Sequence, residues 1–209
     1  MKLIATILVI FTLLIISEAW WRIKKPHDEL SRKFIHITVG TFAAFWPYFL
    51  EWNEIILLSA AFVVVVMVSQ YFGIFKAIHA VERPTWGEVC FALAVGILAF
   101  ITREPAVYTA ALLHMSLADG FAAIAGKWWG RSNCYVILGH RKSIAGSGMF
   151  LFVSLVILLV YNTMLPTPMH PVAIVGVAGA ATVFENISIR GLDNLLVPLL
   201  VASALVFFS

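Results

Sequence analysis

The sequence predicts an all-α polytopic membrane protein that folds as a single transmembrane domain over residues 1–209. Of the 209 residues, 62% are hydrophobic and 12% are charged, and the mean hydropathy is +0.97. A soluble domain carries roughly 25% charged residues. The apolar residues also fall into eight runs, most of them close to the ~20 residues that a helix needs to cross the hydrocarbon core. Finally, the basic residues gather between alternate runs.

The eight apolar runs are the expected transmembrane helices. They cover residues 3–21, 34–50, 55–75, 88–102, 106–126, 148–162, 172–186 and 195–208. Three of them are short, so we expect about eight helices, between seven and nine. The first run resembles a secretory signal peptide, but cleavage would export the basic segment 20–33, and short basic segments tend to stay in the cytoplasm. We therefore expect residues 1–21 to remain as the first helix, followed by a helical bundle over 22–209.

The distribution of basic residues predicts the orientation. With the N-terminus outside, the inner loops hold 12 of the 14 basic residues, and only Lys2 and Arg103 lie outside. The inner residues are Arg22, Lys24, Lys25, Arg32, Lys33, Lys76, Arg83, Lys127, Arg131, Arg141, Lys142 and Arg190. Because positive charge favours the cytoplasmic side, both termini are expected outside. The polar residues then gather at the cytoplasmic face.

The first polar stretch leads into the second run. Arg32 and His36 are four residues apart and share a helical face, with Lys33 beside them and Glu29 one turn earlier. Two cations and an imidazole on one stripe suit an anionic phosphate group. The alternative is a belt of basic side chains that extend to the lipid headgroups, but His36 lies a turn deeper than such a belt requires.

Two acidic residues stand out in the fourth and fifth runs. Glu88 opens the fourth run, where the helix dipole alone favours a carboxylate. Asp119 lies about two turns inside the fifth run, and a carboxylate within a membrane is a functional candidate because its burial is costly. Gly126 and Gly130 follow on the same face and leave that side bare, so that a ligand or a neighbouring backbone can approach. The alternative is close helix packing through small residues.

The segment 127–147 has the composition of a phosphate-binding loop. Basic residues and glycines precede a helix N-terminus, where backbone N–H groups bind anions. The candidate residues are Arg131, Gly139, Arg141, Lys142, Ser143, Gly146 and Ser147. It is not a P-loop, because Arg141 occupies the position of the glycine before the Lys-Ser pair. A solvated basic loop is the alternative.

Carboxylates at the ends of the last two runs complete the polar cluster. Glu185 closes the seventh run, and Asp193 and Asn194 open the eighth. Asp193 could serve only as a helix cap. Together with Asp119, however, Glu185 and Asp193 lie at one depth near the basic loop, which suggests Mg²⁺ held by carboxylate and phosphate oxygens.

The order of these motifs resembles the CTP-dependent lipid kinases, namely dolichol or polyprenol kinase, phytol kinase and CTP-dependent diacylglycerol kinase, which are related to phosphatidate cytidylyltransferase. The resemblance covers about residues 29–198 and departs from the family at Ala145, where relatives often carry an acidic residue. It rests on five motifs in the family's order. They are Glu29-x-x-Arg32-Lys33-x-x-His36, Gly87-Glu88, Asp119-x6-Gly126-x3-Gly130, Lys142-Ser143-x-x-Gly146-Ser147 and Glu185 followed by Asp193-Asn194.

The resemblance implies transfer of the γ-phosphate of CTP, with a divalent metal, to the hydroxyl of a membrane lipid alcohol. An isoprenoid alcohol is the expected acceptor; diacylglycerol kinase and then cytidylyltransferase activity are the alternatives. The expected general bases are Asp119 and His36. A small transporter is the rival outside this class, but transporter sites lie near the midplane. We expect a protein of the inner (cytoplasmic) membrane with no nucleic-acid partner.

Overall fold

The computed structural model describes residues 1–24, 28–72 and 86–208, and of residues 21–22, 24, 28–31 and 70 it describes the backbone alone. The described part of the chain contains eight helical rods. Seven of the rods are single helices: α1 (Lys2–Lys24), α2 (Asp28–Ala44), α3 (Trp52–Phe72), α5 (Gly87–Ile101), α8 (Ile144–Asn162), α9 (Pro171–Ile187) and α10 (Asp193–Phe208). The remaining rod runs from α6 (Pro105–Leu113) through the π-helical turn η2 (His114–Ala118) into α7 (Asp119–Trp129). A short 3₁₀ turn, η1 (Trp46–Tyr48), follows α2.

Each of the eight predicted runs coincides with one of these rods, so the helical membrane fold is confirmed. Four rods contain a segment that is long and apolar enough to cross a membrane, namely Lys2–Trp20, Trp52–Ser69, Pro105–Trp129 and Ile144–Asn162. The helices α5, α9 and α10 are apolar but shorter. A count of eight membrane crossings therefore stays a prediction. The predicted end of the third run, at residue 75, and the predicted inner residues Lys25, Lys76 and Arg83 lie outside the described residues.

The helical bundle carries one addition that the sequence did not predict, because β1 (Cys134–Ile137) and β2 (His140–Ser143) pair as an antiparallel hairpin. The chain reverses through Leu138 and Gly139, whose φ angles are 47° and 79°. Two consecutive residues with positive φ form the tight turn whose twist suits a hairpin. This hairpin occupies the middle of the segment 127–147, which the sequence presents as a basic loop.

The helix boundaries follow local signals. Pro105 and Pro171 begin α6 and α9, where the missing N–H of proline costs nothing. Ser143 caps α8, since its hydroxyl accepts a hydrogen bond from the N–H of Gly146 at 3.1 Å. Because Ser143 also ends β2, the hairpin leads directly into α8.

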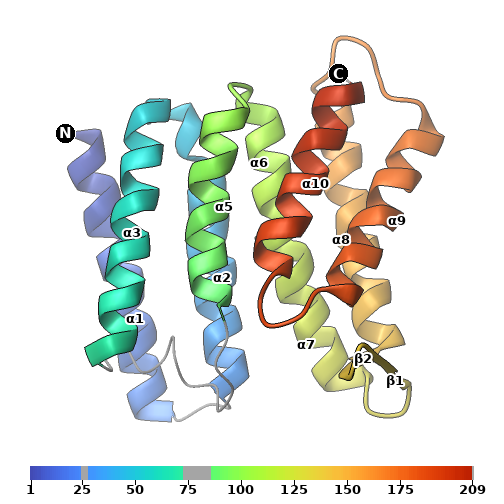
Figure 1. The fold of residues 1–209 in the computed structure, drawn as a ribbon, viewed down its shortest axis with the longest axis horizontal. Coiled ribbons are helices and arrows are strands. Elements are labelled where there is room, and N and C mark those ends of the chain that lie inside the picture. Colours follow the sequence, from blue (N-terminus) through green and yellow to red (C-terminus); the bar gives the residue numbers. More distant parts are fainter. Residues whose placement is uncertain (25–27, 73–85, 209) are drawn as a thin grey trace.

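The central rod is α6–η2–α7, and its α6 segment is buried on every side over Val107–Leu112. Its largest fully buried side chains, Tyr108 and Leu112, pack with Phe150 and Leu158 of α8. The chain termini in α1 and α10 lie at one end of the bundle, and the hairpin lies at the other with the loop between α9 and α10 (Figure 1). The polar residues of the predicted site therefore belong to one end of the bundle.

Candidate functional site

The centre of the site is Asp119, the first residue of α7, whose side chain is 9% exposed. Lys33 of α2 donates a hydrogen bond from Nζ to Asp119 Oδ2. His36, one turn further along α2, places Nε2 3.4 Å from the same oxygen. The carboxylate predicted to be functional thus faces two of the residues predicted to act with it, although 86 positions separate Lys33 from Asp119 in the chain.

The π-helical turn η2 makes a backbone group available to this site. His36 Nε2 lies 2.8 Å from the carbonyl oxygen of Met115, inside η2. A carbonyl can only accept, so Nε2 carries the proton. A π-helical turn interrupts the regular hydrogen-bonding pattern of a helix, and such turns are frequent at functional sites. The turn therefore fixes both the orientation and the tautomer of His36.

Two glycines bring α2 close enough to η2 and α7 for these contacts. A Cβ atom on Gly40 would lie 2.6 Å from Cβ of Ser116, and one on Gly120 would lie 2.2 Å from Cγ1 of Ile37. Such distances are far below van der Waals contact, so neither position accepts a larger residue without displacing the helices. Close approach through small residues is a common way to pack membrane helices.

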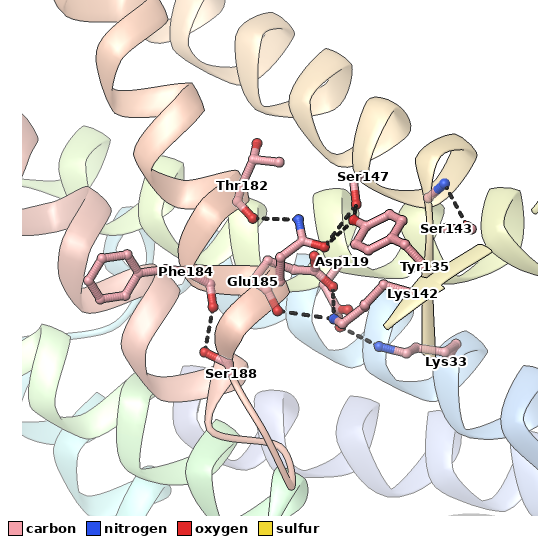
Figure 2. A network of polar contacts seen from close by, with 12 residues as sticks. Lys33, Asp119, Tyr135, Lys142, Ser143, Ser147, Thr182, Phe184, Glu185 and Ser188 are labelled. Atoms are coloured by element: carbon pink, nitrogen blue, oxygen red, sulfur yellow. Dashed lines mark hydrogen bonds and ion pairs between the residues drawn. The ribbon is translucent and has the colours of Figure 1, made fainter. Parts of the chain in front are cut away.

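A second ion pair joins the hairpin to α9. Lys142 Nζ lies 2.5 Å from Oε1 of Glu185 and donates to the carbonyl oxygen of Glu185 at 3.0 Å. Burial alone would lower the pKa of Lys142, but the Glu185 carboxylate outweighs this effect and the pKa is raised above 10.5. Lys142 is therefore cationic at neutral pH. Figure 2 shows this pair beside Asp119 and Lys33.

The hairpin is anchored by a polar cluster around Asn186. Tyr135 donates from Oη to Oδ1 of Asn186 at 2.5 Å, and Ser147 donates from Oγ to the same oxygen at 3.0 Å. The amide nitrogen of Asn186 donates in turn to the carbonyl oxygen of Thr182 at 2.8 Å. Tyr135 and Lys142 are paired across the two strands, so one face of the hairpin supplies both contacts to α9 (Figure 2).

Asp193, the first residue of α10, connects the two ion pairs electrostatically. The charges of Asp119, Lys33 and Lys142 all act on its carboxylate. The structure thus brings together six sequence-predicted residues from five elements. They are Lys33, His36, Asp119, Lys142, Glu185 and Asp193.

Other predicted residues have a structural explanation. Asn194 donates from Nδ2 to the carbonyl oxygen of Gly87 at 2.9 Å. Gly191, with φ of 89°, packs so closely on Gly87 that a Cβ there would lie 2.4 Å from the Cα of Gly87. These contacts join the start of α10 to the start of α5, where Glu88 is half-buried in the first turn. Arg32 also reaches this junction, since its Nη1 lies 3.6 Å from the position that a Cβ on Gly87 would occupy.

The glycines after Asp119 face protein atoms in this structure. A Cβ on Gly126 would lie 3.1 Å from Oγ of Ser143, and one on Gly130 would lie 2.5 Å from the same atom. Gly146 of α8 is equally close to α7, with the carbonyl oxygen of Ala122 at 3.1 Å from its Cβ position. These glycines let α8 pack on α7, which is the packing alternative that the sequence left open.

The exposed part of the hairpin lies apart from the buried cluster. Arg141 is paired with Val136 on the face opposite Lys142, and both are exposed. Arg131 and Gly139 are exposed as well. Glu29 is the remaining predicted residue, and the structure describes only its backbone, which lies in α2.

Sequence reasoning missed Tyr135 and Asn186 as site residues. The signal for Tyr135 was available in the alternation of Cys-Tyr-Val-Ile before Leu-Gly, which is a short strand followed by a turn. Asn186 adjoins Glu185 and gives no separate signal.

The described residues contain no group of three or more His, Cys, Asp or Glu side chains close enough together to hold a metal ion. Asp119 and Glu185 are instead each bonded to a lysine. The predicted three-carboxylate arrangement is therefore not assembled as a ready cage. A cation bound here would need ligands in addition to the protein's carboxylates.

Comparison with known proteins identifies a relative over nearly the whole chain. The chain is 30% identical over 203 residues to a phytol kinase of Synechocystis sp., and the match covers 92% of this chain and 84% of the relative. No family profile matches the chain, and no solved structure matches it.

Proposed function

The chain belongs to the phytol kinase family, and from that premise we propose that it transfers the γ-phosphate of CTP to the hydroxyl of an isoprenoid alcohol in the membrane. The observation that carries the proposal is the pairing of one buried and one partly buried lysine with two buried carboxylates at one end of an apolar bundle. Phosphoryl transfer depends mainly on positioning and on neutralising charge. A cluster of fixed cations at the bundle end suits that task, because the acceptor lies in the bilayer and the donor in water.

The geometry supports a division of roles. We assign the nucleotide phosphates to the hairpin and its Lys142, which is anchored by Glu185 but remains 23% exposed. We assign the transferring phosphoryl group to Arg32 and Lys33, on the helix that faces Asp119. The proton of the acceptor hydroxyl would pass to Asp119 or His36, the two bases of the cluster.

We propose that a divalent cation binds at this site together with the donor phosphates. Two of the carboxylates that would hold it, Asp119 and Glu185, each contact a lysine in this structure. Mg²⁺ is usually held by one or two carboxylates together with substrate phosphates, so a complete protein cage is not required. Asp119, Asp193 and Glu185 are the residues that would hold it. When bound, the cation supplies charge neutralisation for the phosphates.

The orientation of the site follows from the charge distribution. The hairpin end of the bundle carries the basic loops, and we propose that it faces the cytoplasm of the inner membrane, where a soluble nucleotide is available. The helices place the acceptor hydroxyl at that interface and its apolar part between them.

The test is a transfer assay with purified protein in lipid nanodiscs. Donors labelled at the γ-phosphate (CTP, UTP, ATP and GTP) are combined with phytol, a polyprenol, dolichol or diacylglycerol. We expect label on an isoprenoid alcohol from CTP, and none from Asp119→Asn. Glu104→Gln, at an exposed carboxylate directly before α6, is the matched control and should keep full activity. Label transferred from the α-position of CTP would instead indicate nucleotidyl transfer, and transfer to no alcohol would refute the proposal.

A further inference from the structure

An apolar groove of about 540 Å³ lies between α9 and α10, in the half of the bundle away from the hairpin. Its α9 wall includes Ala173, Gly176 and Ala180, and its α10 wall includes Leu200 and Ala204. Every lining residue other than His170, at the far end, is glycine or carries a hydrocarbon side chain. The volume is typical of a small-molecule binding site.

The groove leads toward the polar cluster. Along α10, the residues Ala204, Leu200, Leu196 and Asp193 follow at intervals of three or four and so share a face. Leu196 lies between the groove and the carboxylate of Asp193, and its side chain is 38% exposed. The described chain therefore does not cover this face of α10 between the groove and Asp193. The α10 wall therefore leads to a carboxylate of the site.

The groove has room that no part of the described chain fills. A Cβ atom on Gly176 would have no neighbour within 4 Å, whereas the glycines around the polar cluster have neighbours below 3.2 Å. The glycines near the site serve helix packing, and Gly176 does not. An apolar ligand can therefore lie against α9 at this point.

We propose that this groove binds the isoprenoid tail of the acceptor alcohol and thereby places its hydroxyl beside Asp193. The inference rests on the proposed function. From Asp193 to Phe208, α10 spans 15 residues, or about 22 Å, which is long enough for an extended isoprenoid tail.

Two glycines of α9 provide a matched pair of variants. Gly176 lines the groove, whereas Gly179 does not, and a Cβ atom added at either position would have no neighbour within 4 Å. Gly176→Phe should therefore fill the groove without disturbing the fold, and Gly179→Phe makes the same substitution one turn away. Gly176→Phe is expected to raise KM for phytol at least tenfold and KM for geraniol, a much shorter alcohol, less than twofold. Gly179→Phe should change neither KM.

Photo-crosslinking tests the groove independently of turnover. A phytol analogue with a diazirine at the tail end should label α9 and α10 in the wild type, in competition with phytol, and Gly176→Phe should reduce the labelling at least fivefold. If no phosphate is transferred but this labelling occurs, the proposed function fails and the groove assignment stands. The assignment is wrong if competed labelling lies elsewhere or is absent. It is also wrong if Gly176→Phe leaves KM for phytol unchanged, or if a phosphatidylcholine diazirine labels the groove and phytol does not compete.

Discussion

Replacing Asp119 by Asn should weaken the fold as well as stop turnover. The Lys33–Asp119 pair is buried, with both side chains 9% exposed. The substitution keeps the size of the side chain but leaves the Lys33 ammonium without its counter-charge. Removal of one partner from a buried pair costs about 3–5 kcal/mol. At about 2–4 °C per kcal/mol for a chain of this length, Tm should fall by roughly 6–20 °C.

A double-mutant cycle separates this electrostatic cost from other effects. Lys33→Met alone should also lower Tm, because it leaves Asp119 without its cation. The double variant Lys33→Met/Asp119→Asn removes both charges, and neutral replacements of a buried pair are often tolerated. Its Tm should lie well above that of either single variant, although it should be inactive. The readout is tryptophan fluorescence during thermal unfolding in detergent. If the two losses add, with a coupling below about 0.5 kcal/mol, the pair contributes no stability and the reasoning is wrong.

Three further predictions concern the hairpin, a glycine contact and the topology. Lys142→Ala should raise KM for CTP at least tenfold, whereas Arg141→Ala, on the opposite face of the hairpin, should raise it less than threefold. Because the pKa of Lys142 is raised, this side chain stays charged between about pH 7 and 9, and its titration should not change KM for CTP of the wild type in that range. Equal effects of the two substitutions in steady-state kinetics would contradict the assignment. Gly191→Ala should lower the free energy of unfolding by about 1–3 kcal/mol, because the residue has φ of 89° and a Cβ atom there would lie 2.4 Å from a backbone atom of Gly87. Thermal unfolding measures this loss, and an unchanged Tm would rule out the contact. In a cysteine-free background of intact cells, an impermeant thiol reagent should label cysteine at Thr167 and not at Asn133, and the reverse pattern would overturn the orientation.

The helices could be predicted from the sequence because each is a continuous apolar run bounded by polar residues, proline or glycine. The hairpin was less visible. Its strands have four residues each, and the basic residues of β2 give it the composition of a solvated loop. Its alternation has meaning only once Tyr135 and Lys142 are known to face α9, and a single sequence does not contain that contact.

The site was predictable in its residues but not in its pairing. A carboxylate inside a membrane helix is rare enough to identify Asp119 at once. Which cation it faces depends on how α2 packs against η2 and α7, and that packing is set by Gly40 and Gly120, whose role is visible only in three dimensions. Gly126 shows the same limit, because its bare side is visible in the sequence but the neighbour at that side, Ser143, is visible only in the structure.

The π-helical turn before Asp119 constrains the length of the chain rather than its composition. A π-helical turn holds one residue more than the α-helical turn that it replaces, and it absorbs this residue with little change in the direction of the segment that follows. Deleting Leu117 would therefore leave a more regular helix with Asp119 facing close to its present direction, but it would change the hydrogen bonding around the carbonyl group of Met115, which contacts His36. Relatives that place a histidine against this carbonyl should therefore keep the same number of residues between Pro105 and Asp119.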